Sequence, residues 1–282
     1  MLTRMRYFVT GARGQLGVTL VDILPENSVF AINLPEYDVT DIETMRHAFD
    51  GRSVDVVIHC AAYTNVDRCA LNPEIANLVN AIGTRNIAYL CAEYGATMVL
   101  LSTNEVFDGR KPYSYTERDI PGAINSYGES KLAAERYILD ILERYYIVRT
   151  SWMYAAGGAN FVHTILDLAS QGQDIAVVTD ELGAPTYAQD LASAIIELVD
   201  RAPYGIYHLV NSGNVSRYGF ARQVLNLTGY SSLAIKPILL EEYERESCPP
   251  RNGILSNWAA SSYGITLRPW QTALGEFLTN VT

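Results

Sequence analysis

Residues 7–17 have the sequence Tyr7-Phe8-Val9-Thr10-Gly11-Ala12-Arg13-Gly14-Gln15-Leu16-Gly17. A short β-rich run is followed by glycines at every third position and then by an apolar-periodic segment over residues 18–24. This order predicts a strand, a tight glycine turn and a helix. Glycine permits the turn, lets the backbone approach a ligand closely and lets the helix pack on a sheet. A pyrophosphate would then rest on the N-terminus of the helix.

The next predicted strand, residues 29–33, indicates which nicotinamide cofactor this turn would hold. It ends at Asn33, where an NAD site uses an acidic residue to accept the ribose hydroxyls. Asn33 can bond a 2′-hydroxyl without repelling a 2′-phosphate, and Arg13 can pair with that phosphate. The sequence therefore favours NADPH slightly over NADH. Asp38 and Val39 follow in a loop and are expected near the adenine, with helix capping as the alternative for this region.

Two later segments, residues 54–60 and 97–103, are near-continuous apolar runs, as expected of strands buried on both faces of a parallel sheet. Two alanines follow the first run, and two hydroxyl residues end the second. These residues are Ala61, Ala62, Ser102 and Thr103. The carboxyl ends of parallel strands share the edge where ligands bind, so we expect all of them at the cofactor crevice.

A Tyr and a Lys that suit proton transfer follow these strands. Residues 127–139 contain good helix formers and an apolar stripe, so Tyr127 and Lys131 are expected on one face of a helix. A nearby ammonium favours phenolate, so Lys131 is expected to lower the pKa of Tyr127 towards a useful range. The chain has 19 Tyr, and such a spacing also arises by chance. The pair gains weight from the glycine turn upstream.

Composition restricts the class of protein. The chain has 282 residues, of which 49% are hydrophobic and 18% charged, which suits one large α/β domain or two unequal domains. The net charge of −10 argues against nucleic acid or an acidic membrane surface as a partner. The cysteines show no CxxC or zinc-like spacing, so no metal site is expected. Residues 1–6 form no apolar signal region, and a cytoplasmic protein is expected.

The pattern of elements predicts an α/β fold, a Rossmann-like doubly wound parallel sheet with a smaller C-terminal substrate-binding lobe. Residues 1–150 are expected to form the dinucleotide-binding domain. Residues 151–282 are expected to form mainly the lobe, with residues 205–211 as a candidate strand that returns to the main sheet. Within the lobe we expect a helix at 161–170, a strand at 175–178, a turn at 183–187 and a helix at 188–199.

The order of these motifs resembles the extended short-chain dehydrogenase/reductase superfamily. The motifs are Thr10-Gly11-x-x-Gly14-x-x-Gly17, Ala61-Ala62, Ser102-Thr103 and Tyr127-x-x-x-Lys131. More narrowly, the chain resembles the dTDP-4-dehydrorhamnose reductase family along almost its whole length. The segments that carry this likeness are Gly14-Gln15-Leu16-Gly17, residues 59–67, Arg149-Thr150-Ser151-Trp152-Met153-Tyr154, Asn160-Phe161 and Gly183-Ala184-Pro185-Thr186. The resemblance implies an NAD(P)H-dependent oxidoreductase that reduces a nucleoside-diphosphate 4-keto-deoxysugar, converting dTDP-4-dehydrorhamnose to dTDP-rhamnose.

The resemblance also implies roles for individual residues. Tyr127 would be the proton donor, Lys131 would bind the nicotinamide ribose, and Thr103 would tune the site. Together with the turn and strand ends, the residues expected to bind NADPH or NADH are Gly11, Arg13, Gly14, Gln15, Leu16, Gly17, Asn33, Asp38, Val39, Ala61, Ala62, Tyr63, Thr64, Leu101, Tyr127 and Lys131. Those expected at the nucleotide sugar are Thr103, Asn104, Trp152, Asn160, Phe161 and Arg251, with Arg251 as the cation for its diphosphate.

The chain departs from the family at two places. Where the family has Ser-Thr-Asp-Tyr-Val-Phe, this chain has Asn104 and Glu105 in place of the Asp and Tyr that lie beside the sugar, and Pro249-Pro250 replaces an Arg-Pro. The identity of the sugar is therefore open. Glu105 either faces the diphosphate or is a solvated side chain.

An alternative function is a non-catalytic nucleotide-binding regulatory subunit, because the β-subunit of methionine adenosyltransferase resembles this family too. Fold alone does not decide between an enzyme and a binding subunit. The intact Thr103, Tyr127 and Lys131 favour the enzyme. A homodimer is a candidate assembly.

Overall fold

The computed structural model describes residues 5–281; residues 1–4, within the segment expected to lack a signal region, and residue 282 lie outside the described part. A six-stranded parallel sheet runs through its centre in the order β10-β5-β4-β3-β1-β2. The strands are β1 (Tyr7–Thr10), β2 (Val29–Ile32), β3 (Val56–His59), β4 (Thr97–Thr103), β5 (Tyr145–Thr150) and β10 (Gly205–His208). This order reverses at β1 and β3, as in a doubly wound α/β fold, so the predicted fold class is confirmed.

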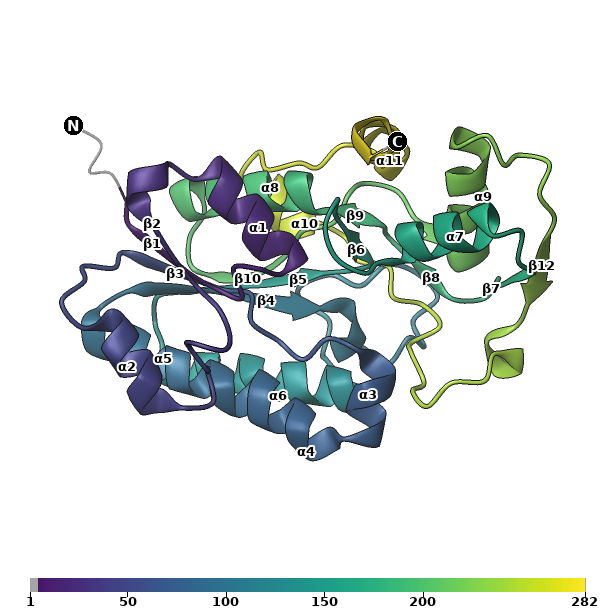
Figure 1. Ribbon diagram of the computed structural model, residues 1–282. Coiled ribbons are helices and arrows are strands. Elements are labelled where there is room, and N and C mark those ends of the chain that lie inside the picture. Colours follow the sequence, from purple (N-terminus) through teal and green to yellow (C-terminus); the bar gives the residue numbers. More distant parts are fainter. Residues whose placement is uncertain (1–4, 282) are drawn as a thin grey trace.

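Helices cover both faces of the sheet, so the core has two halves. Figure 1 shows α1 (Gln15–Ile23), α8 (Ala188–Arg201) and α10 (Trp258–Ser261) above the sheet. Below it lie α2 (Ile42–Phe49), α3 (Val66–Leu71), α4 (Pro73–Ala76), the π-helical turn η2 (Asn77–Ile82), α5 (Gly83–Tyr94) and α6 (Ser126–Ile141). Side chains alternate along each strand, so Val9 packs in the upper cluster and Phe8 in the lower one.

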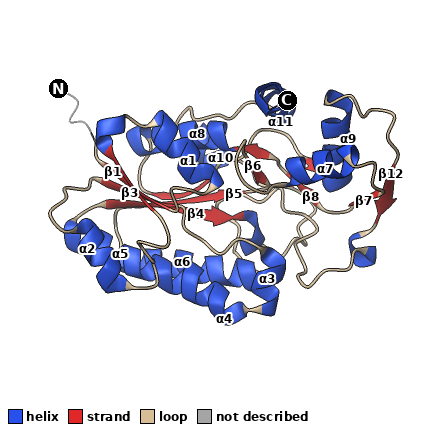
Figure 2. Ribbon diagram, viewed as in Figure 1, coloured by secondary structure: helices blue, strands red, loops and turns tan. Residues whose placement is uncertain are grey.

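The C-terminal lobe extends beyond the carboxyl ends of the main strands. Its helices are α7 (Phe161–Ser170), α9 (Arg217–Leu227) and α11 (Trp270–Val281), and its strands are β6 (Met153–Tyr154), β7 (Ile175–Val178), β8 (Leu182–Gly183), β9 (Thr186–Tyr187), β11 (Val215–Ser216) and β12 (Ile235–Ile238). The strands form three separate pairs, of which β7 and β12 are visible in Figure 2 at the far end from β1. Aromatic residues such as Tyr154, Phe220 and Phe277 fill the core of the lobe.

The chain differs from the sequence-based expectations at element ends. The segment 183–187, expected as a turn, contributes to two short strands, because Leu182–Gly183 pairs with β11 and Thr186–Tyr187 with β6. The strand at residues 205–208 pairs in parallel with β5 and so does return to the main sheet. Short one-turn helices at Glu26–Ser28, Asn104–Val106 and Leu240–Glu242 complete the structure.

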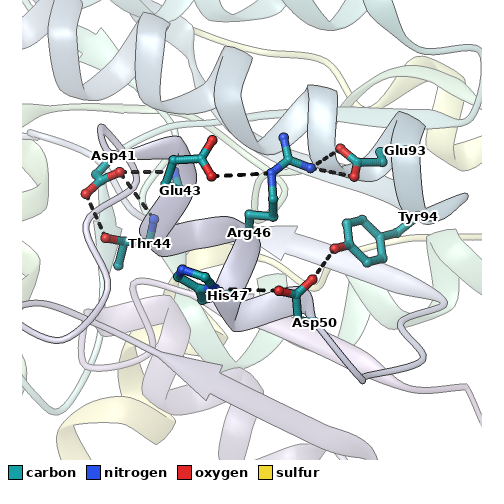
Figure 3. A network of polar contacts seen from close by, with 8 residues as sticks. All are labelled: Asp41, Glu43, Thr44, Arg46, His47, Asp50, Glu93 and Tyr94. Carbon is teal, nitrogen blue, oxygen red and sulfur yellow. Dashed lines mark hydrogen bonds and ion pairs between the residues drawn. The ribbon is translucent and has the colours of Figure 1, made fainter.

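A network of hydrogen bonds and ion pairs connects helix α2 to helix α5 (Figure 3). Asp41 caps α2 by accepting hydrogen bonds from the backbone N–H groups of Glu43 and Thr44. At the other end of the helix, Arg46 pairs with Glu93, and the hydroxyl of Tyr94 donates to Asp50. Helix capping therefore falls to Asp41, whereas one carboxylate oxygen of Asp38 accepts from the backbone and hydroxyl of Thr40 at 2.9 and 2.8 Å.

A buried ion pair joins α6 to strand β5 of the sheet. Arg149 on β5 donates to both oxygens of Glu135 on α6, at 2.9 and 2.6 Å, and each side chain is only 2% exposed. Ser102 on β4 adds a third hydrogen bond to Glu135 at 2.5 Å. The Ser102 hydroxyl therefore donates its proton to this pair, while Ser102 and Thr103 both line the crevice as expected.

We predict that Glu135→Ala lowers the free energy of unfolding by about 3–5 kcal/mol, because it leaves the Arg149 guanidinium buried without its counter-charge. Urea titration followed by circular dichroism measures the loss. The matched control is Glu197→Ala, which breaks the exposed pair with Arg201 on α8 and should cost less than about 1 kcal/mol. Equal losses in the two variants would contradict the structural role of the buried pair.

Candidate active site

A cavity of about 930 Å³ follows the carboxyl edge of the sheet. It begins at the glycine turn, passes the end of β4 and the start of α6, and ends at Trp152 and Arg217 in the lobe. A second hollow of about 370 Å³ lies at the opposite end, where Arg13 and Asn33 line both spaces. The position agrees with the rule that α/β sheets bind ligands beyond their strand ends, where the strand order reverses.

The glycine turn has the shape of an anion cradle. Gly11 has a φ of +66°, and a Cβ there would lie 2.6 Å from the backbone nitrogen of Ala61. A Cβ on Gly17 would lie 2.2 Å from the carbonyl oxygen of Gly11, so neither position accepts a side chain. Gly14 is the N-cap of α1 and offers no side-chain cap. The first N–H groups of α1 are therefore available to a phosphate, and these residues fit a dinucleotide.

Arg13 and Asn33 lie together at the outer end of the cavity. The Arg13 backbone N–H donates to Asn33 Oδ1 at 3.3 Å, and its guanidinium donates to the carbonyl of Leu34 at 3.2 Å. The side chain at the end of β2 is thus a neutral amide next to a cation. Asp38 and Val39 also line this end.

Thr103, Tyr127 and Lys131 meet in the middle of the cavity. Thr103 ends β4, while Tyr127 and Lys131 stand one turn apart on α6, whose first turn is capped by Asn125. Lys131 is 2% exposed, and burial lowers its pKa to about 8 against the opposing effect of Glu135. The helix and the shared position of the three residues agree with the sequence-based expectation.

The prediction that Lys131 lowers the pKa of Tyr127 is wrong for the free protein. Burial is the largest influence and raises the pKa of Tyr127, the Glu105 carboxylate raises it further, and a hydrogen bond with Thr103 only partly opposes them. Desolvation penalises the phenolate more than its neighbours stabilise it. The phenol is therefore protonated throughout the neutral range.

The loop after β3 turns one predicted residue away from the cavity. Ala61, Ala62 and Thr64 line it, but Tyr63 does not. Asn80 holds the backbone of Tyr63 with two hydrogen bonds, at 2.7 and 3.0 Å, and also bonds Ser130 on α6 at 2.9 Å. This buried amide holds the loop against α6, so its contribution is structural support.

The lobe end of the cavity is built around Trp152. Its backbone is left-handed, with a φ of +45°, and the guanidinium of Arg217 stacks over its ring at 3.7 Å. Arg217 also pairs with Glu181 at 2.9 Å. Asn160 caps α7 and reaches Gln15 Oε1 at 3.4 Å, which connects the lobe to the glycine turn. Phe161 does not line the cavity and instead stacks on Phe220.

The arginine predicted to be the cation for the diphosphate does not line the cavity. Arg251 lies outside the cavity, is 60% exposed, and pairs with Asp180 and Glu241 at 3.6 Å. Arg217 takes its place in the cavity lining. The sequence carried no signal for this residue, because it begins α9 far along the chain and meets Trp152 only through the packing of the lobe.

Asn104 and Glu105, which depart from the family pattern, both line the cavity. Asn104 is 5% exposed and packs so closely on Gly253 that a Cβ there would lie 2.2 Å from its amide nitrogen. Glu105 lines the cavity and accepts a hydrogen bond from Asn125 at 2.7 Å. The alternative of a solvated Glu105 side chain is therefore wrong. Burial raises the pKa of Glu105 to about 7, although the Asn125 hydrogen bond opposes this shift.

The described part of the chain holds neither a cluster of metal ligands nor a membrane-spanning helix. Residues 5–281 contain no cluster of three or more His, Cys, Asp or Glu side chains arranged to hold a metal ion. None of the helices in the same range is both long enough and apolar enough to cross a membrane.

Comparisons with known proteins agree with this geometry. Residues 5–282 match the family described as the RmlD substrate binding domain. Spore coat polysaccharide biosynthesis protein SpsK of Bacillus subtilis is 38% identical over 97% of this chain and 96% of its own length. A dTDP-4-dehydrorhamnose reductase of Mycolicibacterium smegmatis is 37% identical over 95% of this chain and 84% of its own length. Among solved structures, the Bacillus anthracis dTDP-4-dehydrorhamnose reductase in complex with NADP has 34% sequence identity and a TM-score of 0.95. The match covers 99% of this chain and 100% of that one.

We predict that Gly183→Ala displaces Trp152, because the new Cβ would lie 2.5 Å from the indole ring. The overpacking should cost about 1–3 kcal/mol of stability and change the near-ultraviolet circular dichroism of the tryptophans. Gly122→Ala is the matched control, since a Cβ there meets nothing within 4 Å. An unchanged tryptophan spectrum in Gly183→Ala would show that this glycine does not position Trp152.

Proposed function

The chain belongs to the RmlD substrate binding domain family, and on this premise we propose that it reduces dTDP-4-dehydrorhamnose to dTDP-rhamnose with NADPH or NADH. It is an oxidoreductase of the extended short-chain dehydrogenase/reductase type. The observation that supports the reaction best is the meeting of Thr103, Tyr127 and Lys131 midway between the glycine turn and Trp152. The same intact trio favours the enzyme over the regulatory-subunit alternative.

The chain's own residues divide the work of binding between the two ends of the cavity. The N–H groups at the start of α1 hold the pyrophosphate of the cofactor, and Lys131 holds the hydroxyls of the nicotinamide ribose. The bound nicotinamide supplies the hydride that reduces the carbonyl carbon. At the lobe end, Arg217 supplies a cation for the diphosphate of the sugar nucleotide. An acidic protein with a net charge of −10 needs such local cations to retain an anionic substrate.

Tyr127 moves the proton. Its hydroxyl donates to the alkoxide that develops on the substrate, and the Thr103 hydroxyl orients the carbonyl towards it. Burial keeps the Tyr127 phenol protonated until it is needed, since its pKa is raised. Lys131, with a pKa lowered to about 8, carries its charge at and below neutral pH, where it stabilises the phenolate left after proton transfer.

NADPH is the proposed physiological reductant. The end of β2 presents the neutral amide of Asn33, and Arg13 lies beside it with its guanidinium at the rim of the cavity. A 2′-phosphate meets a cation there and no carboxylate from β2, whereas a 2′-hydroxyl still finds the amide. A modest preference for NADPH follows from this arrangement.

Tyr127→Phe removes the proton donor and keeps the ring. We expect a loss in kcat on the order of 10²–10⁴ with NADPH affinity within a few-fold of wild type. Turnover of dTDP-4-dehydrorhamnose is followed by NADPH absorbance, and affinity by fluorescence titration. Tyr113→Phe, at a tyrosine that is 65% exposed, is the control and should behave as wild type. A normal rate in Tyr127→Phe would refute the assigned role.

Arg217→Ala should raise KM for the sugar nucleotide by about tenfold or more, because it removes a charge-assisted contact with the diphosphate. NADPH affinity should change little. Arg251→Ala removes the same charge outside the cavity and serves as the matched control, with an expected change below about twofold. A larger increase of KM in Arg251→Ala than in Arg217→Ala would contradict this proposal and favour Arg251 as the cation for the diphosphate.

Asn33→Asp should lower the ratio of kcat/KM for NADPH to that for NADH several-fold, because the carboxylate repels a 2′-phosphate. Arg13→Ala should lower the same ratio by weakening NADPH alone. Steady-state kinetics with both cofactors measures the ratio. A wild-type protein that accepts only NADH would contradict the proposed preference.

A further inference from the structure

Glu105 is a carboxylate in the active site that the reduction does not use. It lines the same cavity as Thr103 and Tyr127. Its backbone N–H donates to Thr103 Oγ1 at 3.2 Å, and its carbonyl oxygen lies so close to α6 that a Cβ on Gly128 would be 2.1 Å away. The residue is thus placed between the strand end that carries Thr103 and the helix that carries Tyr127.

The Glu105 side chain is held in a defined orientation. Asn125 caps α6 by accepting from the Gly128 N–H at 2.8 Å, and its amide donates to Glu105 Oε2 at 2.7 Å and to the Cys248 carbonyl at 3.1 Å. One amide therefore links the helix cap, the carboxylate and the C-terminal lobe. Among residues 5–281, no hydrogen bond reaches the other oxygen of Glu105, Oε1. That oxygen is free to take a proton.

The charges around Glu105 let it hold or lose a proton near neutral pH. Burial raises its pKa to about 7; the Asn125 hydrogen bond opposes this, Glu181 raises the pKa, and Arg245 and Arg217 lower it. Tyr127 and Cys69 face it from α6 and α3, and both have pKa values that its charge raises. A carboxyl group of this kind exchanges protons efficiently at the pH of the cell.

We propose that Glu105 acts as a base on the carbon next to the substrate's ketone, which gives this site a second, non-redox activity: exchange of that carbon's proton. The inference rests on the proposed function, because it requires a bound 4-keto sugar. Ketones have acidic protons on the adjacent carbons, since the resulting negative charge moves to oxygen. Thr103 and Tyr127 are already placed to stabilise a negative oxygen at that position.

The step balances without a further reactant. Glu105 Oε1 takes the proton from the carbon, the C–H electron pair becomes a carbon–carbon double bond, and the carbonyl π pair moves to the oxygen, to which Tyr127 donates its proton. In the reverse direction the oxygen returns its proton to Tyr127, and the carboxyl group of Glu105 returns a proton to the carbon. Nothing is oxidised or reduced. In D2O the carboxyl group of Glu105 exchanges its proton for deuterium between proton removal and proton return, so deuterium enters the sugar.

The test follows deuterium entry into dTDP-4-dehydrorhamnose in D2O by mass spectrometry and proton NMR, with protein present and both NADPH and NADH absent. We expect wild-type exchange at least about tenfold above a buffer blank, and a rate that rises with pH through about 7, since only the carboxylate form of Glu105 accepts a proton. Glu105→Gln should lose at least tenfold more in exchange than in NADPH-dependent reduction. Glu143→Gln, an exposed residue beyond the far end of α6, is the control and should lose neither.

The outcomes separate this inference from the proposed function. Wild-type reduction without exchange above the blank would overturn the inference and leave the reductase intact. Exchange that depends on Glu105 without reduction would support the base and refute the reductase. Equal losses of both activities in Glu105→Gln, with unchanged NADPH affinity, would show a positioning role and also overturn the inference. If Glu105→Gln fails to fold, Glu105→Asp replaces it, and exchange must again fall more than reduction.

Discussion

The buried ion pair between Glu135 and Arg149 is the interaction on which the active site depends. It joins α6 to β5, and through Ser102 it also reaches β4, so the helix that carries Tyr127 and Lys131 is held against the strand that ends in Thr103. The negative charge of Glu135 also acts on Lys131, because it raises the pKa of that ammonium against the effect of burial. One structural pair thus fixes both the position of the ammonium and part of its proton affinity.

Amide side chains hold the C-terminal lobe to the domain that contains the main sheet. Asn160 connects α7 to Gln15 in the glycine turn, and Asn125 connects the cap of α6 to Glu105 and to the Cys248 carbonyl. An amide can donate and accept at once, so each of these residues satisfies several backbone or side-chain groups without adding charge. This suits a cavity that must bind anionic ligands in an acidic protein.

Burial decides the electrostatics of the cavity more than neighbouring charges do. It raises the pKa of Tyr127 and of Glu105 and lowers that of Lys131, so each of the three is shifted towards its neutral form. A ligand that displaces water and brings its own phosphates changes this balance. The cations at the two ends, Arg13 and Arg217, lie at the cavity wall where such phosphates would approach.

The sequence by itself determined the features that depend on near neighbours in the chain. The glycine turn, the apolar strands and the spacing of Tyr127 and Lys131 follow from backbone sterics and from the periods of helix and strand. Only the tertiary structure decided that Arg217 and not Arg251 lines the cavity, that Tyr63 turns away from it, and that Glu105 lies near Tyr127. Each of these depends on segments that are distant in the chain, and on how much water the packed elements leave around a charge. No local sequence pattern encodes these distant contacts or the amount of water around a charge, because both are set when the lobe packs against the end of the sheet during folding.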